Sequence, residues 1–301
     1  MESLRTPDDR FADLPDFAFE PNYLTIPDGD GGQLRVHYLD EGPADASPVL
    51  LMHGEPSWSF LYRFMIPGLV AAGHRVVVPD LPGFGRSDKP SLKEDYTFAR
   101  MVQWMSAAMF DVLDLHDITF FGQDWGGLIG LRLVAADPDR YARVAVGNTG
   151  LPTGHGTPPK AFTDWQEFAQ NSPSFPIGKI VTSMATSKPG PEVVAAYEAP
   201  FPDDSYTAGA RVLPSLVPTS LQDPESAANI AAWEVLGQFT KPVLTMFSDK
   251  DPITNGGEKA FLERVPGCAG QPHTIIQNAG HFLQEDAGPE MAEILNTFIA
   301  S

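Results

Sequence analysis

FFGQDWGG, residues 120–127, runs from an apolar strand through a glycine-flanked turn into the start of a helix. This strand–turn–helix has the form of a nucleophile elbow, in which small residues let the chain turn sharply and expose one side chain. The residue at the exposed position is Asp124. Aspartate is also a favoured helix N-cap, so the motif alone fits a nucleophile and a structural cap about equally. The neighbouring motifs have to decide between the two.

On both sides of this motif, short apolar runs alternate with stretches of helical periodicity. This alternation is typical of the α/β class, in which helices cover both faces of a mostly parallel sheet. We predict strands at residues 33–39, 49–52, 75–78, 118–121, 144–146, 243–247 and 274–276. We predict helices at residues 98–113, 128–136 and 289–299. Functional groups in such a sheet gather at the carboxyl ends of the strands, so the residues that follow each strand are the candidates for a site.

The segment at residues 151–222 interrupts the alternation. It is rich in Pro, Gly, Ser and Thr, and it contains helical pieces at residues 161–170 and 192–199 but no strong strand. A structureless connection of this length is unusual in a compact domain. The chain of 301 residues is long enough for a core with an inserted lobe. We therefore predict a core domain at residues 1–150 and 223–301 and a helical cap domain at residues 151–222.

The composition excludes several kinds of partner. The formal net charge is −19, from 20 Lys and Arg against 39 Asp and Glu, so nucleic acid and anionic membranes would repel the chain. Cys268 is the single cysteine, and no Cys/His pair has zinc spacing, so we expect no metal. Residues 83–85 (GFG) lack the third glycine of a dinucleotide loop, so we expect no cofactor. The absence of a signal segment and of an apolar run near 18 residues predicts a cytoplasmic protein.

The motif HGEP, residues 53–56, directly follows the predicted strand at residues 49–52. In proteins with a nucleophile elbow, the loop at this place supplies one backbone N–H of an oxyanion hole, and the residue after the nucleophile supplies the other. The two candidate amides are those of Glu55 and Trp125. A tight turn with an exposed Glu55 is the structural alternative, but the position after a buried strand favours the oxyanion hole.

Two further candidates follow the last predicted strands. Asp251 lies in SDKDP, residues 248–252, and His281 lies in NAGHF, residues 278–282. Nucleophile, acid and histidine in this order give the chain order of the α/β-hydrolase catalytic triad. Asp249 competes for the acid role, and the sequence leaves this choice open, although the place of Asp251 beside a proline favours it. No GxSxG occurs in the chain, which argues against a serine esterase.

Taken together, these motifs resemble those of the haloalkane dehalogenases of the α/β-hydrolase superfamily. The segments that carry the resemblance are HGEPSWSFLYR, DLPGFGRSDKP, GQDWGG, SDKDP and NAGHF, and the likeness extends over nearly the whole chain. It is greatest to the subfamily whose catalytic acid follows the seventh strand. The resemblance implies an α/β-hydrolase fold with a mostly parallel sheet, helices on both faces and an inserted helical cap domain.

The resemblance also implies roles for individual residues. Asp124 would be the nucleophile, His281 the base and Asp251 the acid that orients the base. The indole N–H groups of Trp125 and Trp165 would hold the halide.

Further positions follow from the same resemblance. Asn148 matches a slot that holds a glutamate acid in another subfamily, and an amide here supports Asp251 as the acid. The resemblance places the lining of the substrate cavity at Phe162, Leu128, Leu213, Pro214 and Val217.

The implied activity is hydrolysis of a haloalkane to a primary alcohol and a halide through an alkyl ester on the nucleophile. The expected partners are a halogenated alkane, water and the halide ion, and we expect a monomer. An epoxide hydrolase with the same triad is the alternative, and it would need acidic O–H donors such as Tyr197 and Tyr206 of the cap. A fluoroacetate-type dehalogenase would place Arg, not Trp125, after the nucleophile. A non-catalytic binding protein of the same fold would typically lack a triad member, whereas all three slots are filled here.

Overall fold

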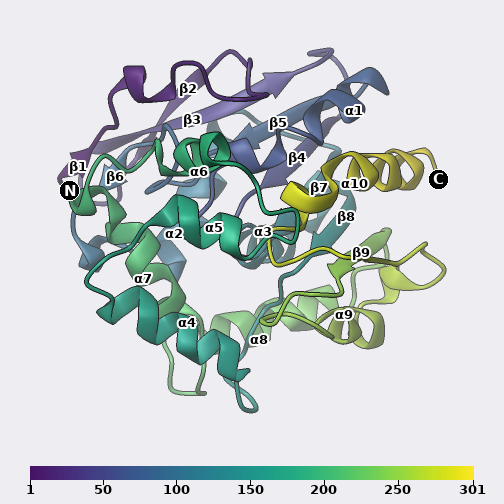
Figure 1. Cartoon of the computed structure of the whole chain (residues 1–301). Helices are drawn as coiled ribbons and strands as arrows, with labels where there is room; N and C mark the ends of the chain where they lie inside the picture. Colours follow the sequence, from purple (N-terminus) through teal and green to yellow (C-terminus); the bar gives the residue numbers. More distant parts are fainter.

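The computed structural model describes all 301 residues, and an eight-stranded sheet lies at its centre (Figure 1). The strand order is β10-β9-β8-β7-β4-β5-β3-β2. Neighbouring strands from β10 to β5 are parallel, whereas β3 pairs antiparallel with β5 and with β2. The strands are β2 (Asn22–Pro27), β3 (Gln33–Glu41), β4 (Pro48–Met52), β5 (Arg75–Pro79), β7 (Ile118–Gln123), β8 (Tyr141–Gly147), β9 (Val243–Ser248) and β10 (Thr274–Ile276). A separate ribbon pairs β1 (Ser3–Leu4) with β6 (Lys89–Pro90).

Helices cover both faces of the sheet, which confirms the predicted α/β fold class. Helices α1 (Ile66–Ala71) and α10 (Leu283–Ala300) pack against each other on one face. On the other face, α3 (Trp125–Ala136) packs between α2 (Phe98–Ser106) and α8 (Ser226–Leu236), and α9 (Glu258–Arg264) packs against β9 (Figure 1). Every residue of β4, β7 and β9 is buried, which explains why these strands are continuous apolar runs in the sequence.

The predicted strands are all present, but strand β2 of the main sheet and the short strands β1 and β6 were not predicted. Strand β2 alternates between buried and exposed residues at the edge of the sheet, and its short NYLTIP sequence follows Pro21 and ends at Pro27. The predicted helix at residues 98–113 is α-helical only as far as Ser106 and then continues as a π-helical turn at Ala107–Val112.

Two predicted helices begin earlier than their sequences indicate. Helix α3 begins at Trp125. Gly126 and Gly127 lower the helix propensity of its first turn, so the sequence indicates a later start, but close packing requires both glycines. A Cβ on Gly126 would collide with the carbonyl of Met52. Helix α10 begins at Leu283, and Pro289 lies inside it just after a kink at Ala287, so the proline does not mark the helix start as it often does.

Between β8 and β9 the chain forms helices and no strand, as predicted for this segment. The predicted helical pieces are confirmed as α4 (Lys160–Asn171) and α6 (Pro191–Glu198). Three more helices between these strands were not predicted: α5 (Ile177–Ser183) is short, α7 (Ala208–Leu216) contains Pro214, and α8 (Ser226–Leu236) follows the predicted cap segment. Helix α4 packs against α7, and α5 packs against α6 (Figure 1).

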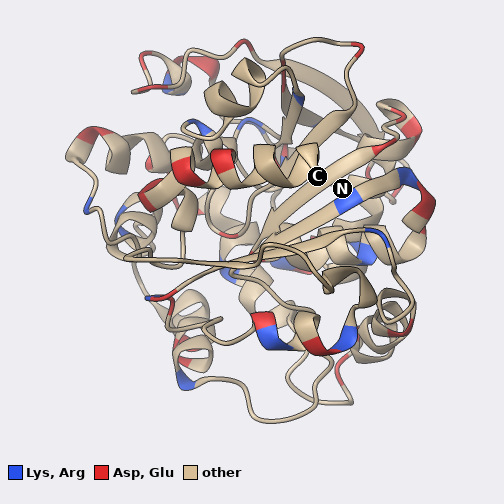
Figure 2. Ribbon diagram, turned by 90° about the vertical axis from the view of Figure 1, so that its right-hand side faces the viewer, with Lys and Arg blue, Asp and Glu red and all other residues tan.

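Acidic residues are spread over the molecule. Figure 2 shows Asp and Glu on several helices and loops of the face in view, with Lys and Arg interspersed among them. The excess of 39 acidic over 20 basic residues is thus a property of the whole chain. None of the helices combines the length and the apolar character that crossing a membrane would require.

Candidate active site

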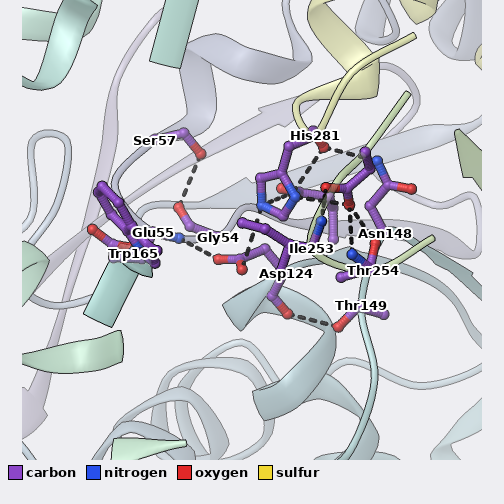
Figure 3. A network of polar contacts seen from close by, with 12 residues as sticks. Gly54, Glu55, Ser57, Asp124, Asn148, Thr149, Trp165, Ile253, Thr254 and His281 are labelled. Carbon is purple, nitrogen blue, oxygen red and sulfur yellow. Dashed lines mark hydrogen bonds and ion pairs between the residues drawn. The ribbon is translucent and has the colours of Figure 1, made fainter. Parts of the chain in front are cut away.

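The topology of the sheet brings the predicted motifs to one edge. Strands β4 and β7 are parallel neighbours with Met52 opposite Gly122, so the oxyanion loop and the elbow that follow them meet. Strands β8, β9 and β10 continue the parallel order, and the segments that follow them reach the same edge. Figure 3 shows the side chains from these segments converging around Asp124 and His281. The site therefore lies at the carboxyl ends of the strands, as the α/β class predicts.

The backbone of Asp124 has φ 51° and ψ −126°, a region that residues other than glycine avoid at a cost of about 1–3 kcal/mol. Its N–H donates to the Asn148 carbonyl at 3.1 Å, and the Thr149 hydroxyl donates to the Asp124 carbonyl at 2.7 Å. A Cβ on Gly54 would collide with the Asp124 side chain, so glycine is required there. The Asp124 side chain makes no N-cap hydrogen bond to α3, so the structural-cap interpretation of the elbow is wrong.

The two carboxylate oxygens of Asp124 have different surroundings (Figure 3). Oδ1 accepts the Glu55 N–H at 2.8 Å, which is the amide predicted for the oxyanion hole. Oδ2 lies 3.5 Å from Nε2 of His281. The structure shows no hydrogen bond from the Trp125 N–H to this carboxylate. Glu55 is only 3 % exposed, so the alternative of a surface turn is wrong.

Asp251 and His281 form a buried pair, with 2.9 Å between Asp251 Oδ2 and His281 Nδ1. The Ile253 N–H donates to Asp251 Oδ1 at 2.9 Å, and the Thr254 hydroxyl also donates to this carboxylate. Burial by itself raises the pKa of Asp251, but the His281 ring and these hydrogen bonds outweigh it and lower the pKa below its ordinary value. Asp251 is therefore an ionised partner for the imidazole.

Asp249, the competing acid, does not face the imidazole. Its carboxylate lies 2.8 Å from Lys250 Nζ and accepts the Ala279 N–H at 3.3 Å. The geometry therefore favours Asp251 over Asp249 as the acid that orients His281.

Amide side chains support the histidine, and sequence reasoning missed one of them. The Asn148 amide donates to the carbonyls of Gly280 at 3.0 Å and His281 at 2.9 Å, so it fixes the backbone of the loop that carries His281. The Gln123 amide lies 3.2 Å from both the carbonyl and Nε2 of His281. Gln123 is buried directly before Asp124, and its place inside the elbow motif is the signal that could have identified it.

A cavity of about 430 Å³ opens above the two Asp124 oxygens. Its lining includes Trp125 and Trp165, the two predicted halide donors, together with His281. Four of the predicted pocket residues also line it, namely Phe162, Leu128, Pro214 and Val217. No three His, Cys, Asp or Glu side chains in the structure are arranged to hold a metal ion.

The prediction of Leu213 as a lining residue is wrong. Leu213 has no exposed surface and belongs to the hydrophobic core, whereas its neighbour Pro214 lines the cavity. Successive residues of a helix point about 100° apart, so the two neighbours on α7 face different surroundings.

Comparisons with known proteins identify the family of this chain. A protein family described as alpha/beta hydrolase fold matches residues 47–288. A haloalkane dehalogenase of Psychrobacter cryohalolentis is 58% identical over 99% of this chain and 98% of its own, and one of Mycobacterium marinum is 51% identical over 97% and 98%. A haloalkane dehalogenase structure from Paraglaciecola agarilytica, described as tetrameric, has a TM-score of 0.90 and 35% identity, with 97% of each chain covered. The chain belongs to the haloalkane dehalogenase family.

The positions of two tyrosines separate this dehalogenase from the epoxide-hydrolase alternative. An epoxide hydrolase needs acidic O–H donors that face the reacting oxygen. Tyr197 is fully buried and donates its hydroxyl to Glu285 at 2.6 Å, and neither it nor Tyr206 lines the cavity. The cavity of this dehalogenase is therefore lined by Trp125 and Trp165 and by no tyrosine.

One contact in the dehalogenase cavity was not anticipated from the sequence. The indole N–H of Trp165 donates to Oε2 of Glu55 at 3.2 Å (Figure 3). Trp165 is held there by stacking on Phe175 at 5.7 Å and on Phe168 at 5.8 Å between ring centroids. A predicted halide donor thus has a carboxyl partner within the protein.

Proposed function

We propose that this dehalogenase hydrolyses haloalkanes to a primary alcohol and a halide through an alkyl ester on Asp124, assisted by His281 and Asp251. The asymmetry of the Asp124 carboxylate is the observation that supports this mechanism most. Oδ1 is occupied by the Glu55 N–H at 2.8 Å, whereas Oδ2 lies beside the base, 3.5 Å from His281 Nε2, at the end of a largely apolar cavity.

In the first step Oδ2 attacks the carbon that carries the halogen, and the electron pair of the carbon–halogen bond leaves with the halide. The carboxylate is a better nucleophile in the cavity than in bulk water, because fewer water molecules solvate it. The departing halide needs no proton but does need its negative charge stabilised. The indole N–H groups of Trp125 and Trp165 are the donors available for this in the cavity.

In the second step water attacks the ester carbon Cγ of Asp124 while His281 takes a proton from that water. The negative charge develops on Oδ1, where the Glu55 N–H already donates and the Trp125 N–H is the second candidate donor. When the tetrahedral intermediate collapses, the alcohol oxygen receives the proton from His281. The Asp124 carboxyl then loses its remaining proton to solvent, and the site is restored.

The charge of Asp124 also determines at which step His281 can act as a base. Burial lowers the pKa of His281, but the charges and hydrogen bonds of Asp251 and Asp124 outweigh it and raise the pKa above its ordinary value. Ester formation removes the negative charge of Asp124. The pKa of His281 therefore falls after the first step, and the neutral imidazole becomes available when water has to be activated.

The acid can be tested against its neighbour in the sequence. Asp251→Asn is expected to lower kcat for alcohol release by about 1,000- to 10,000-fold, because an amide neither stabilises the imidazolium nor enforces its tautomer. Asp249→Asn is the matched control and should stay close to wild type, since its partner is Lys250. Steady-state kinetics with a terminal bromoalkane measures both. Equal losses in the two variants would contradict the assignment of the acid.

The boundaries of the cap domain are part of the proposal. We assign residues 151–222 to a helical cap over the cavity and residues 1–150 and 223–301 to the core. Helix α8 supports the second boundary because it packs on the core helix α3. Arg132 of α3 lies 2.9 Å from Glu225, just before α8, and this ion pair ties the returning chain to the core.

A cytoplasmic monomer remains our prediction for the working form of the protein. Cys268, the single cysteine, is buried, so no disulfide between chains is built into the surface. The exposed large hydrophobic side chains come from separate segments of the chain, namely Tyr23, Leu92, Val112, Phe168, Leu221, Leu262 and Ile275. Light scattering after gel filtration should give the mass of one chain. A fourfold mass, the state described for the P. agarilytica enzyme, would overturn this prediction.

The activity itself is tested with purified protein and a panel of terminal bromo- and chloroalkanes, with an aromatic epoxide in parallel. The expected result is halide and alcohol in equal amounts from the haloalkanes and no diol from the epoxide. Diol without halide would instead assign the triad to an epoxide hydrolase. Turnover of neither substrate would revive the non-catalytic binding protein.

A further inference from the structure

The Glu55 side chain is a buried acid that the proposed mechanism does not use, because only its backbone N–H serves the oxyanion hole. The residue is 3 % exposed and lies next to Asp124 at the cavity. Its Oε2 accepts the Trp165 indole N–H at 3.2 Å. Its Oε1 is buried without any hydrogen-bond partner. No Lys or Arg compensates this carboxyl group, which is unusual for a buried acid.

The charged groups that face Glu55 come from two other segments. The Asp124 carboxylate lies at the elbow, and the His281 imidazole follows β10 with Asp251 behind it. Burial and the charge of Asp124 raise the pKa of Glu55 well above its ordinary value, and the Trp165 hydrogen bond and His281 counteract this only in part. The neutral acid is therefore the favoured form beside an ionised nucleophile.

The protonation of Glu55 has a direct consequence for Trp165, which carries a single indole N–H. A carboxylate accepts a hydrogen bond roughly twice as strongly as a neutral group, so ionised Glu55 would retain this donor. Ionised Glu55 would also repel an anion in the same cavity. Neutral Glu55 holds the donor weakly, and a halide can then compete for it.

We propose that Glu55 is a positioning residue for the halide site. When Glu55 is neutral, its hydrogen bond to the Trp165 N–H is weak and this N–H can donate to the halide. When Glu55 is ionised, it binds the Trp165 N–H strongly and repels the halide. This inference rests on the proposed function, since it takes Trp165 as a halide donor. The proton balance is simple. Halide binds to the protein with Glu55 protonated, and above the pKa of Glu55 the release of the halide is accompanied by release of this proton to solvent.

The sign of the pH dependence follows from this linkage. Below the pKa of Glu55 the bromide affinity is constant. Above this pKa the apparent Kd rises, by up to about tenfold per pH unit, because only the protonated fraction binds bromide. His281 adds a separate loss of affinity at higher pH, since its positive charge also attracts the anion.

The experiment is a titration of the whole protein with sodium bromide, followed by the saturable change in tryptophan fluorescence, from about pH 5 to about pH 10 at constant ionic strength. Circular dichroism at each pH shows that the protein stays folded. Three proteins are compared, namely wild type, Glu55→Gln and Glu290→Gln. Glu55→Gln keeps the backbone N–H and a neutral acceptor for Trp165, and Glu290→Gln makes the same chemical change at an exposed position of α10.

We expect wild type and Glu290→Gln to lose bromide affinity in two steps as the pH rises. Glu55→Gln should lack the lower step and keep only the one that belongs to His281. The same steps in Glu55→Gln as in wild type, or a pH-independent Kd in wild type, would overturn the inference while leaving the halide site intact. No saturable bromide binding in any of the three proteins would overturn the proposed halide site as well.

Infrared spectroscopy provides a second readout that does not depend on binding. A protonated carboxylic acid has a carbonyl band that a carboxylate lacks. Wild type at neutral pH should show a buried band of this kind that is missing in Glu55→Gln and present in Glu290→Gln. Identical spectra of wild type and Glu55→Gln in this region would show that Glu55 is ionised and would overturn the inference.

Discussion

His281→Phe is expected to leave the protein carrying the alkyl group of its substrate as a stable ester on Asp124. The imidazole acts only when water attacks the ester, so its removal should spare the first step and block the second. One equivalent of halide should appear quickly, and steady-state turnover should fall by at least about 1,000-fold. The intact mass should rise by the mass of the alkyl group, on the peptide that contains Asp124.

The control for this variant is His116→Phe, because His116 is exposed and lies outside the cavity. It should turn over bromoalkanes as wild type does and show no mass increase. A bromoalkane that gives His281→Phe neither a burst of halide nor an adduct would contradict the covalent mechanism. An adduct on a residue other than Asp124 would contradict the assignment of the nucleophile.

Much of the site could be predicted because its residues follow buried strands. A strand that is buried on both faces is a short continuous apolar run, so its carboxyl end can be located to within a residue or two. Glu55 after β4 and Asp124 after β7 were found in this way, and the parallel order of these two strands makes their meeting inevitable. The positions of Asp251 and His281 followed from the same rule for β9 and β10.

The parts that could not be predicted depend on the direction of a side chain or on contacts distant in sequence. Leu213 and Pro214 are adjacent in sequence, yet only Pro214 reaches the cavity, because a helix turns its neighbours to different sides. The contact between Trp165 and Glu55 joins residues 110 positions apart, from helix α4 to the loop after β4. The choice between Asp249 and Asp251 likewise required the actual path of the loop after β9.

Asp124→Ala is expected to reduce halide release almost to nothing, because Asp124 is the carboxylate that lies 3.5 Å from His281 Nε2 on the cavity side of the site. Loss of a nucleophile that acts together with a base typically lowers kcat by about 10,000- to 1,000,000-fold. Bromide should still bind, since Trp125 and Trp165 are intact. Asp111→Ala, an exposed position, is the matched control and should keep wild-type turnover. Halide release at more than about one hundredth of the wild-type rate would reject Asp124 as the nucleophile.

The same position separates loss of chemistry from loss of folding. Asp124 keeps a φ of 51°, which an alanine would also have to adopt, whereas glycine adopts it without strain. Asp124→Gly should therefore be more stable than Asp124→Ala by about 1 kcal/mol, the reverse of the usual ranking of glycine and alanine. Both variants should be equally inactive. Urea unfolding and halide assays on the same samples test this. If the more stable variant were also the more active one, Asp124 would matter for folding alone. If both variants are inactive although their stabilities differ, the missing carboxylate is the cause.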